Sequence, residues 1–297
     1  MKIPFARHRT RLLAALAPLA AVIAAGATAS GAAAVSTAVS SNWSGYVVSA
    51  TDAATGTATS YASVSGTWTQ PTADCSSSSG SASAFWVGLG GNSEVSQALE
   101  QAGTEVGCSA NGTASYSAWY ELVPAPSVKV SLKVGAGDRM YGSVKVNRTN
   151  VTVLLKNLTR GTSFTKTLTM AAPDLTSAEW IAEAPSTCTT YGRCRTVSLT
   201  NFRKVQFSGA RATTSDGHTG AISDGLWDAT AIQLYTQAGD PFSRFAQQVT
   251  AAKALPSTLS ADGSSFLVAW SVDDSATAPG SVHPGFGFGQ SPFGPGF

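Results

Sequence analysis

Apolar and polar residues alternate with a period of two along most of this chain, and a sustained helical period is nearly absent. From Val128 to Val134 every second residue is aliphatic, with lysine or serine between, and Gly135–Asp138 then predicts a turn. The same alternation predicts further strands, at residues 61–68, 115–123, 144–146, 151–155, 164–170, 179–183, 205–211, 229–235 and 265–272.

Many short strands separated by turn signals indicate an all-β domain, an antiparallel β-sandwich of two packed sheets. The one helical candidate, Ser243–Leu255, lies in a polar stretch that fits a loop equally well. No composition change marks a domain boundary between residues 40 and 274, so we expect a single domain there. Residues 275–297 consist mainly of Gly, Pro and Phe and are predicted to form a flexible tail.

The N-terminal segment has the features of a secretory signal peptide. Four basic residues within the first eleven precede an apolar run from Leu12 to about Ala25, and Ala27-Thr28-Ala29 provides a cleavage pattern. The run is shorter than the ~20 residues that a membrane span needs. We therefore predict a signal peptide at 1–29, a short spacer at 30–39, and a secreted, extracellular protein without a membrane anchor after cleavage.

Removal of this leader changes the charge of the protein. The 19 Lys and Arg residues fall to 15, whereas all 17 Asp and Glu residues remain, so the exported chain has a net charge of −2. A net charge of this sign gives no indication of the basic surface that binds nucleic acid. We also expect a monomer.

The four cysteines are even in number, which favours disulfides in an oxidising compartment. Proximity in the sequence favours Cys188–Cys194 and leaves Cys75–Cys108, although four cysteines allow three pairings. A metal site is the competing interpretation, but no histidine lies near any of the four cysteines.

The residue inventory restricts the chemistry. His218 is the only histidine between residues 40 and 274, so a Ser-His-Asp or Cys-His site would have to use it, and it lies in a predicted turn. The chain has no H-E-x-x-H zinc motif and no Gly-rich phosphate loop in the required context. We therefore expect no metal and no cofactor, and an enzyme here would depend on carboxylates and amides.

Five segments combine aromatic and polar residues: SNWSGY (41–46), FWVGLGG (85–91), LEQAGT (99–104), YSAWYEL (116–122) and SAEWIAE (177–183). In a strand, Trp119 and Glu121 share one face, as do Glu179 and Glu183, while Trp180 points to the other side and into the core. An indole beside a carboxylate excludes water, and partial desolvation makes the carboxylate a better proton acceptor.

In these motifs and their order, the chain resembles the eqolisins, or glutamic peptidases, from about Ser40 to Val272. The resemblance implies a concanavalin-like sandwich with a substrate groove on its concave face, and endopeptidase activity on polypeptides. It implies that Glu183, the second glutamate of A-E-W-I-A-E, and Gln101 of Q-A-G-T are the catalytic pair. The groove-lining positions that it implies are Trp43, Trp86, Trp119 and Glu121.

The implied chemistry is physically reasonable. Ionised Glu183 would take a proton from water, and Gln101 would donate an N–H to the oxyanion, a role worth ~3–4 kcal/mol. Because an unperturbed glutamate titrates near ~4.3, one carboxyl could act as base and then acid, so we predict metal-independent activity at acidic pH. One departure is Gly90, where the family often has Asp; the acidic partner is missing or supplied from elsewhere. Residues 239–263 also have no obvious counterpart.

Two other functions fit parts of the same pattern. A glycoside hydrolase on a similar sandwich would need two carboxyl groups ~5–9.5 Å apart, and Glu183 with Glu121 from a neighbouring strand is the best pair for it. A non-catalytic module for carbohydrate or peptide would use the same aromatic groove without cleaving anything.

Overall fold

The computed structural model describes residues 35–51, 55–76, 78–93, 96–188, 194–238 and 248–271, and every regular element in these ranges is a strand. The strands are β1 (Ser36–Ser40), β2 (Trp43–Ser49), β3 (Tyr61–Thr69), β4 (Ala82–Gly90), β5 (Leu99–Cys108), β6 (Ala114–Val123), β7 (Val128–Val130), β8 (Arg139–Asn147), β9 (Asn150–Asn157), β10 (Thr162–Thr169), β11 (Ser177–Glu183), β12 (Ser186–Cys188), β13 (Cys194–Thr196), β14 (Lys204–Thr214), β15 (Thr219–Gly220), β16 (Asp228–Ala238), β17 (Gln248–Pro256) and β18 (Phe266–Trp270).

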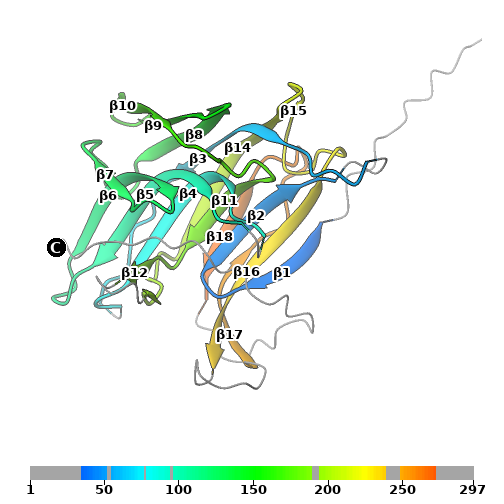
Figure 1. Ribbon diagram of the computed structural model, residues 1–297. Coiled ribbons are helices and arrows are strands. Elements are labelled where there is room, and N and C mark those ends of the chain that lie inside the picture. Colours follow the sequence, from blue (N-terminus) through cyan, green and yellow to red (C-terminus); the bar gives the residue numbers. More distant parts are fainter. Residues whose placement is uncertain are drawn as a thin grey trace, which may run out of the picture. The chain divides into compact units, whose positions relative to one another are not determined.

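All strands except β12 and β13, which form a separate two-stranded sheet, belong to one continuous hydrogen-bonded sheet that folds back on itself. Its order is β10-β9-β8-β3-β14-β18-β17-β16-β2-β11-β4-β5-β6-β7, with antiparallel neighbours throughout; β1 adds in parallel to β16, and β15 pairs with β14. Strands β3, β8 and β9 lie against β4, β5 and β11, so the two ends of the path form packed layers (Figure 1). The predicted all-β antiparallel sandwich is confirmed.

The hydrophobic core fills the space between these layers. On β8 and β9 every second residue is buried, as expected for strands with one face on the core and one toward solvent. Two indole N–H groups make hydrogen bonds between the layers, both at 2.8 Å. Trp68 Nε1 on β3 donates to Thr104 Oγ1 on β5. Trp180 Nε1 on β11 donates to Ser65 O on β3. The prediction that Trp180 points into the core is confirmed.

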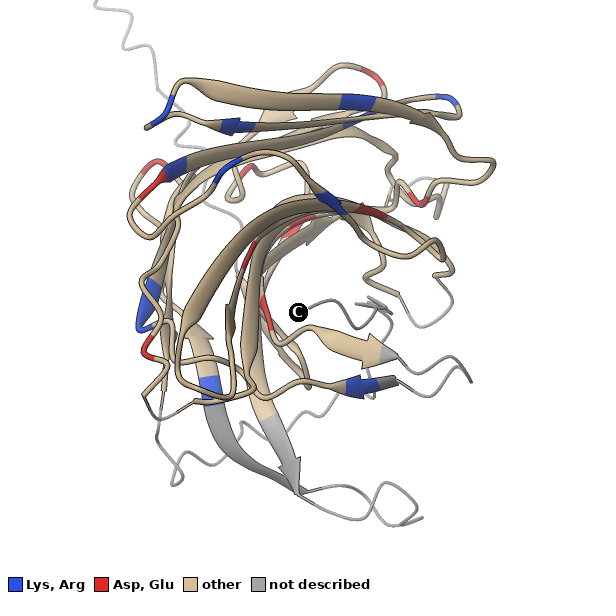
Figure 2. Ribbon diagram, turned by 90° about the vertical axis from the view of Figure 1, so that its left-hand side faces the viewer, with Lys and Arg blue, Asp and Glu red and all other residues tan. Residues whose placement is uncertain are grey.

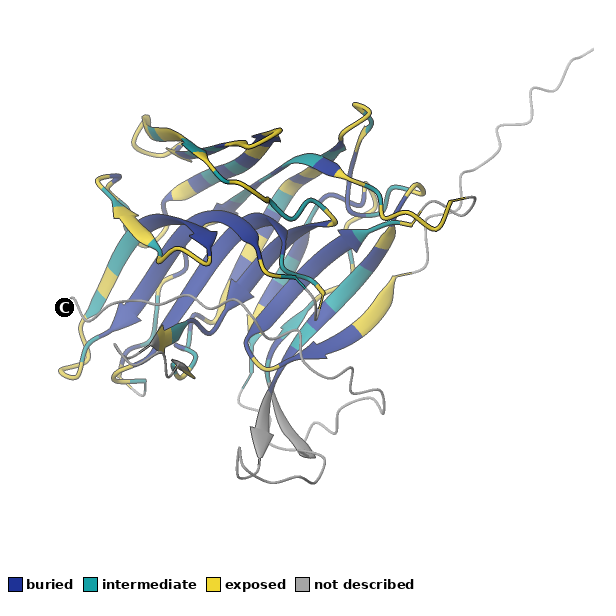
Figure 3. Cartoon of the chain, in the orientation of Figure 1, coloured by how far each residue is buried: buried dark blue, intermediate teal, exposed yellow. Residues whose placement is uncertain are grey.

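Most strands predicted from alternation are present, among them residues 179–183 within β11, but β4 and β5 of the site-bearing layer had no alternating signal. Every residue of β4 and β5 is buried, so both faces of these strands are covered and no exposed polar positions mark their period (Figure 3). The predicted strand at 128–134 is shorter than expected, since only Val128–Val130 pairs, at an edge where Val128 is 43% exposed.

The helical candidate at 243–255 is wrong where the structure describes it. Residues 248–256 form β17, which pairs with β16 and β18, while residues 243–247 lie outside the described residues. Pairing on both sides decides the conformation of a segment whose local sequence has no clear preference.

The predicted signal peptide, residues 30–34 of the spacer and the tail also lie outside the described residues. Ser36–Ser40, at the end of the predicted spacer, pairs with β16 as part of the sheet. In the part of the chain that the structure describes, no helix is long and apolar enough to span a bilayer.

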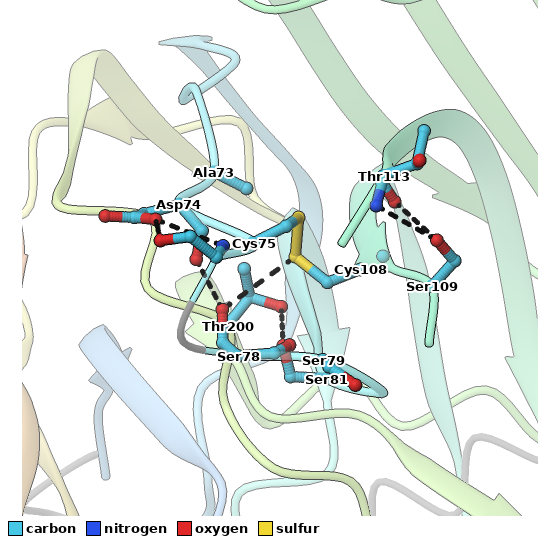
Figure 4. Close-up of a disulfide and its surroundings, with 12 residues drawn as sticks. Ala73, Asp74, Cys75, Ser78, Ser79, Ser81, Cys108, Ser109, Thr113 and Thr200 are labelled. Atoms are coloured by element: carbon cyan, nitrogen blue, oxygen red, sulfur yellow. Dashed lines mark hydrogen bonds between the residues drawn. A yellow bond between two sulfur atoms is a disulfide. The ribbon is translucent and has the colours of Figure 1, made fainter. Parts of the chain in front are cut away.

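The Cys75–Cys108 disulfide is present and ties the segment after β3 to the end of β5 (Figure 4). A group of serine hydroxyls surrounds it, among them Ser78, whose Oγ lies 3.9 Å from Cys108 Sγ. Cys188 and Cys194 are paired in register across the β12–β13 hairpin, which is consistent with the second predicted disulfide. That second disulfide stays a prediction.

Candidate active site

Strands β2, β11, β4, β5 and β6 lie side by side, and their registers bring the predicted site residues to one face. Residues directly opposite in neighbouring antiparallel strands share a face, as do residues two apart along a strand. Three rows result across the strands: Trp43–Glu183–Ala84–Glu105–Ser117, then Gly45–Ile181–Trp86–Gly103–Trp119, then Val47–Glu179–Gly88–Gln101–Glu121. All six residues predicted for the catalytic pair and groove are therefore on one face of the sheet.

The tryptophans of this face form a second apolar cluster, separate from the core between the layers. Trp43 and Trp86 meet edge to face with ring centroids 5.0 Å apart, and Trp119 and Ile181 belong to the same cluster. Gly103 lies between Trp86 and Trp119, and a Cβ on it would lie 2.5 Å from Trp86 Cβ. The glycine is therefore required for the indole of Trp86 to lie against the strand.

Glu183 is 2% exposed, and its carboxylate is held by two donors. Trp86 Nε1 donates to Oε2 at 2.7 Å and Asn42 Nδ2 donates to Oε1 at 3.2 Å. Burial raises the pKa of Glu183 to about 8, while these hydrogen bonds and the neighbouring Trp43 act to lower it and the charge of Glu105 acts to raise it. Asn42 was not predicted as a site residue, although it precedes Trp43 in the S-N-W motif.

Gln101 is completely buried, and Glu121 fixes its amide group. Gln101 Nε2 donates to Glu121 Oε2 at 2.7 Å, while among the described residues Gln101 Oε1 has no hydrogen-bond partner. Because an amide nitrogen carries two hydrogens, the bond to Glu121 leaves one N–H for a second acceptor. Glu121, predicted as a groove-lining residue, therefore also orients Gln101.

The two members of the predicted pair lie on one diagonal of the sheet, with Trp86 between them. On a flat sheet two diagonal steps of ~7–8 Å would separate their Cα atoms by about 15 Å. Neighbouring strands of this sheet are strongly curved, with acidic positions along them (Figure 2). The register thus places Glu183 and Gln101 on one face, on strands separated by β4.

Two further carboxyl groups are buried on this face. Burial raises the pKa of Glu105 to about 6 and holds that of Glu179 well above its usual range. Glu105 also lines a cavity of about 420 Å³ whose other walls include Thr187 and Arg195. Strand parity already placed Glu179 on the face of Glu183, whereas Glu105 was not predicted as a site residue, although its four-residue spacing from Gln101 on the same strand places it on this face.

His218 lies in the expected turn between β14 and β15, and its Nε2 is 3.0 Å from Asp224 Oδ2. This residue is not part of the face that carries Glu183 and Gln101, whose strands are β11 and β5. The carboxylate–amide site is thus independent of the only histidine among the described residues.

Comparison with known proteins agrees with this geometry. The model of the peptidase A4 family matches residues 41–254. Aspergillopepsin-2 of Aspergillus niger is 29% identical over 218 residues, which cover 66% of this chain and 70% of that protein. The crystal structure of scytalido-glutamic peptidase with a transition state analog inhibitor aligns with a TM-score of 0.59 and 26% identity, covering 78% of this chain and 98% of that one.

A second solved structure is SCP-B, a member of the eqolisin family in a complex with the tripeptide Ala-Ile-His; it has a TM-score of 0.57, 25% identity and the same coverage. A family model that spans most of the chain, together with the shared fold, identifies the protein. The chain belongs to the peptidase A4 family, the eqolisins, and is a glutamic endopeptidase.

Proposed function

We propose that Glu183 and Gln101 are the catalytic pair of this endopeptidase. The proposal rests on one observation: two polar side chains, each already held in place by hydrogen bonds, lie on the same buried face of the sheet. Glu183 is held by Trp86 and Asn42, while the amide of Gln101 is oriented by Glu121. Both groups lie on the face that carries the tryptophan cluster. Exclusion of water there strengthens every electrostatic contact with a substrate.

The hydrolysis uses one carboxyl group as base and then as acid. Ionised Glu183 removes a proton from a water molecule, whose oxygen attacks the scissile carbonyl carbon. The free N–H of Gln101 donates to the carbonyl oxygen as it becomes an oxyanion. Glu183 then gives its proton to the amide nitrogen, and the C–N bond breaks to release an amine and a carboxylic acid. The donors Trp86 and Asn42 stabilise the ionised form that begins this cycle.

The pH range of this activity depends on how much water reaches Glu183. With its carboxyl buried, the pKa of Glu183 is about 8, so the base form would be scarce in acid. A water molecule bound for attack rehydrates the carboxylate and brings its pKa back toward the ordinary value. We propose that this hydration accompanies substrate binding and permits action at acidic pH.

We propose that the enzyme works outside the cell as a monomer, on polypeptides and not on nucleic acid. Residues 1–29 serve as the signal peptide, 40–274 form the peptidase domain, and 275–297 form a tail. The Cys75–Cys108 disulfide supports this proposal, because such bonds persist in oxidising compartments.

The pairing of Gln101 with Glu121 also bears on the glycoside hydrolase alternative. Glu121 lies one strand farther from Glu183 than Gln101 does, and one of its oxygens accepts the Gln101 amide. A carboxylate pair flanking one bond would need Glu121 closer and free to act.

The test is incubation of the purified protein with a denatured protein at pH 3 to 8, with fragments identified by mass spectrometry. We expect internal cleavage by the wild type and by Asp216→Asn, an exposed control in the β14–β15 turn, and none by Glu183→Gln. Cleavage by a folded Glu183→Gln variant, or release of sugars but not peptides, would overturn the proposal.

A further inference from the structure

Gly90 ends β4 with a φ of +79°, and the space beside it is filled by another residue. A Cβ built on Gly90 would lie 2.5 Å from Asp174 Cβ and 2.5 Å from Asp174 O. Asp174 therefore occupies the place that a side chain at position 90 would take. Position 90 is also where the resemblance to the eqolisins implies an acidic residue, which this chain lacks.

The carboxylate of Asp174 joins the connection between β4 and β5 to the segment that enters β11. Its Oδ2 accepts from Ser96 Oγ and from the backbone N–H of Gly91 at 3.2 Å. Its Oδ1 accepts from the backbone N–H and the hydroxyl of Thr176, at 3.0 and 2.7 Å. Burial tends to raise the pKa of Asp174, but these hydrogen bonds outweigh it and lower the pKa, so the group is ionised.

Asp174 also contacts the strand that carries Gln101. Its backbone N–H donates to Oε1 of Glu100 at 3.2 Å, and Glu100 immediately precedes Gln101 on β5. The titratable groups on which the charge of Asp174 acts are Glu100 on β5 and Glu179 on β11. Among the described residues no ion pair involves any of the three, so the negative charge of Asp174 acts on its neighbours without a counter-ion.

We infer that Asp174 is a positioning residue of the peptidase site, which supplies from the β11 side the carboxylate that this chain lacks at position 90. It fixes the ends of β4, β5 and β11 relative to one another, and Gln101 and Glu183 lie on two of these strands. Displacement of a catalytic group by ~1 Å can cost 10²-fold in rate. The inference rests on the proposed roles of Glu183 and Gln101.

The charge has a second, measurable effect. Burial raises the pKa of Glu100 to about 8 and that of Glu179 well above its usual range, and in both cases the charge of Asp174 adds to the rise. Asp174 thus helps to keep both neighbours protonated while remaining ionised itself. Replacement by Asn keeps the shape and an acceptor oxygen but removes this charge, so it separates electrostatic from purely structural action.

The first experiment compares activity in Asp174→Ala and Asp174→Asn, with thermal unfolding as a check on folding and Asp216→Asn, an exposed acidic residue, as the control. We expect Asp174→Ala to reduce kcat at least ~10-fold with a smaller change in KM. Asp174→Asn should retain more of the kcat, because it keeps the shape and an acceptor oxygen. A wild-type kcat in folded Asp174→Ala, or an equal loss of kcat in Asp216→Asn, would overturn the inference.

The second experiment does not depend on activity. Carboxyl NMR titration with ¹³C-labelled glutamate, assigned through Glu100→Gln and Glu179→Gln, should show both pKa values about one unit lower in Asp174→Asn than in the wild type. Unchanged values would contradict the electrostatic role even if the enzyme were active. If the wild type cleaved no peptide, the proposed function would fail, whereas this titration would still give its own answer.

Discussion

The indole N–H of Trp86 donates a 2.7 Å hydrogen bond to Oε2 of Glu183, from the strand next to the one that carries the glutamate. This bond favours the ionised carboxylate and opposes the effect of burial on its pKa. Trp86→Phe removes the donor but keeps an aromatic ring. A hydrogen bond to a charged group is worth ~1.5–3 kcal/mol, or about one to two pKa units. We therefore expect the acid limb of the kcat/KM profile to move about one to two units upward in pH.

The matched control for this variant is Trp180→Phe, on the other face of β11. It loses the bond from Nε1 to Ser65 O between the layers, so it should lower the unfolding temperature without moving the pH limb. If both variants shift the limb equally, or if neither does, the bond from Trp86 does not control the protonation of Glu183.

Gly103 is predicted to tolerate no side chain. A Cβ there would lie 2.3 Å from Phe85 O and 2.5 Å from Trp86 Cβ, and neither atom can turn away as the end of a flexible side chain could. Gly103→Ala should cost ~1–3 kcal/mol of unfolding free energy and reduce kcat by displacing Trp86. Gly225→Ala is the control, because nothing lies within 4 Å of the added carbon. Chemical denaturation and peptide hydrolysis measure both effects. Unchanged stability and activity of Gly103→Ala would show that β4 and β5 move apart easily at this position.

The stability of the fold should depend on pH in a direction set by its buried acids. The pKa values of Glu183 and Glu100 are about 8 and that of Glu105 is about 6, whereas glutamates in the unfolded chain titrate near 4.5. Between pH 4.5 and 8 the folded state binds more protons than the unfolded state, so stability falls as pH rises. In more acidic solution the opposite applies, because the pKa of Asp262 is lowered to about 2 and its hydrogen bonds are lost on protonation.

We therefore expect the unfolding temperature to be highest near about pH 4 to 5 and to fall toward pH 8. Glu100→Gln should flatten the slope between pH 5 and 8, since it removes one of the groups that hold a proton, while Asp262→Asn should leave that slope unchanged. Scanning calorimetry of the three proteins at several pH values measures the slopes. A rise in stability from pH 5 to 8 in the wild type would contradict the burial of these carboxyl groups.

The disulfides can be tested by peptide mapping without reduction. We expect two bridges, Cys75–Cys108 and Cys188–Cys194, and no mixed pairing. Replacement of Cys75 and Cys108 by serine opens a loop with a sequence separation of 33 residues, which should cost about 3–4 kcal/mol in unfolding free energy. A Cys75–Cys188 peptide would disprove the pairing in the sheet.

The parts of the fold that could be predicted from sequence are those with one face in water. Strands β8 and β9 alternate buried and exposed residues, so their period is visible along the chain. Every residue of β4 and β5 is buried, because both faces of these strands are covered. Their sequences therefore show no alternation of apolar and polar residues. Residues 248–256 have no strong local preference, and pairing on both sides makes them a strand.

The site also has features that the sequence predicted and features that only the folded structure shows. Motif order identified Trp43, Trp86, Gln101 and Glu183, and strand parity correctly placed Trp119 and Glu121 on one face. The bond between Gln101 and Glu121 depends on the register of β5 against β6, which no local pattern specifies. The contact between Gly90 and Asp174 joins residues 84 positions apart in the chain, so only the folded arrangement shows it.

The most direct test of the account is kcat/KM for one internally quenched peptide, measured for the wild type, Glu183→Gln, Gln101→Ala and the double variant. Thermal unfolding of each would confirm its folding. Because the two side chains act on one transition state, we expect each single variant to lose at least ~10²-fold and the double variant to lose little more than the worse single one. A folded Glu183→Gln or Gln101→Ala enzyme within ~10-fold of the wild type would contradict the assignment of this pair.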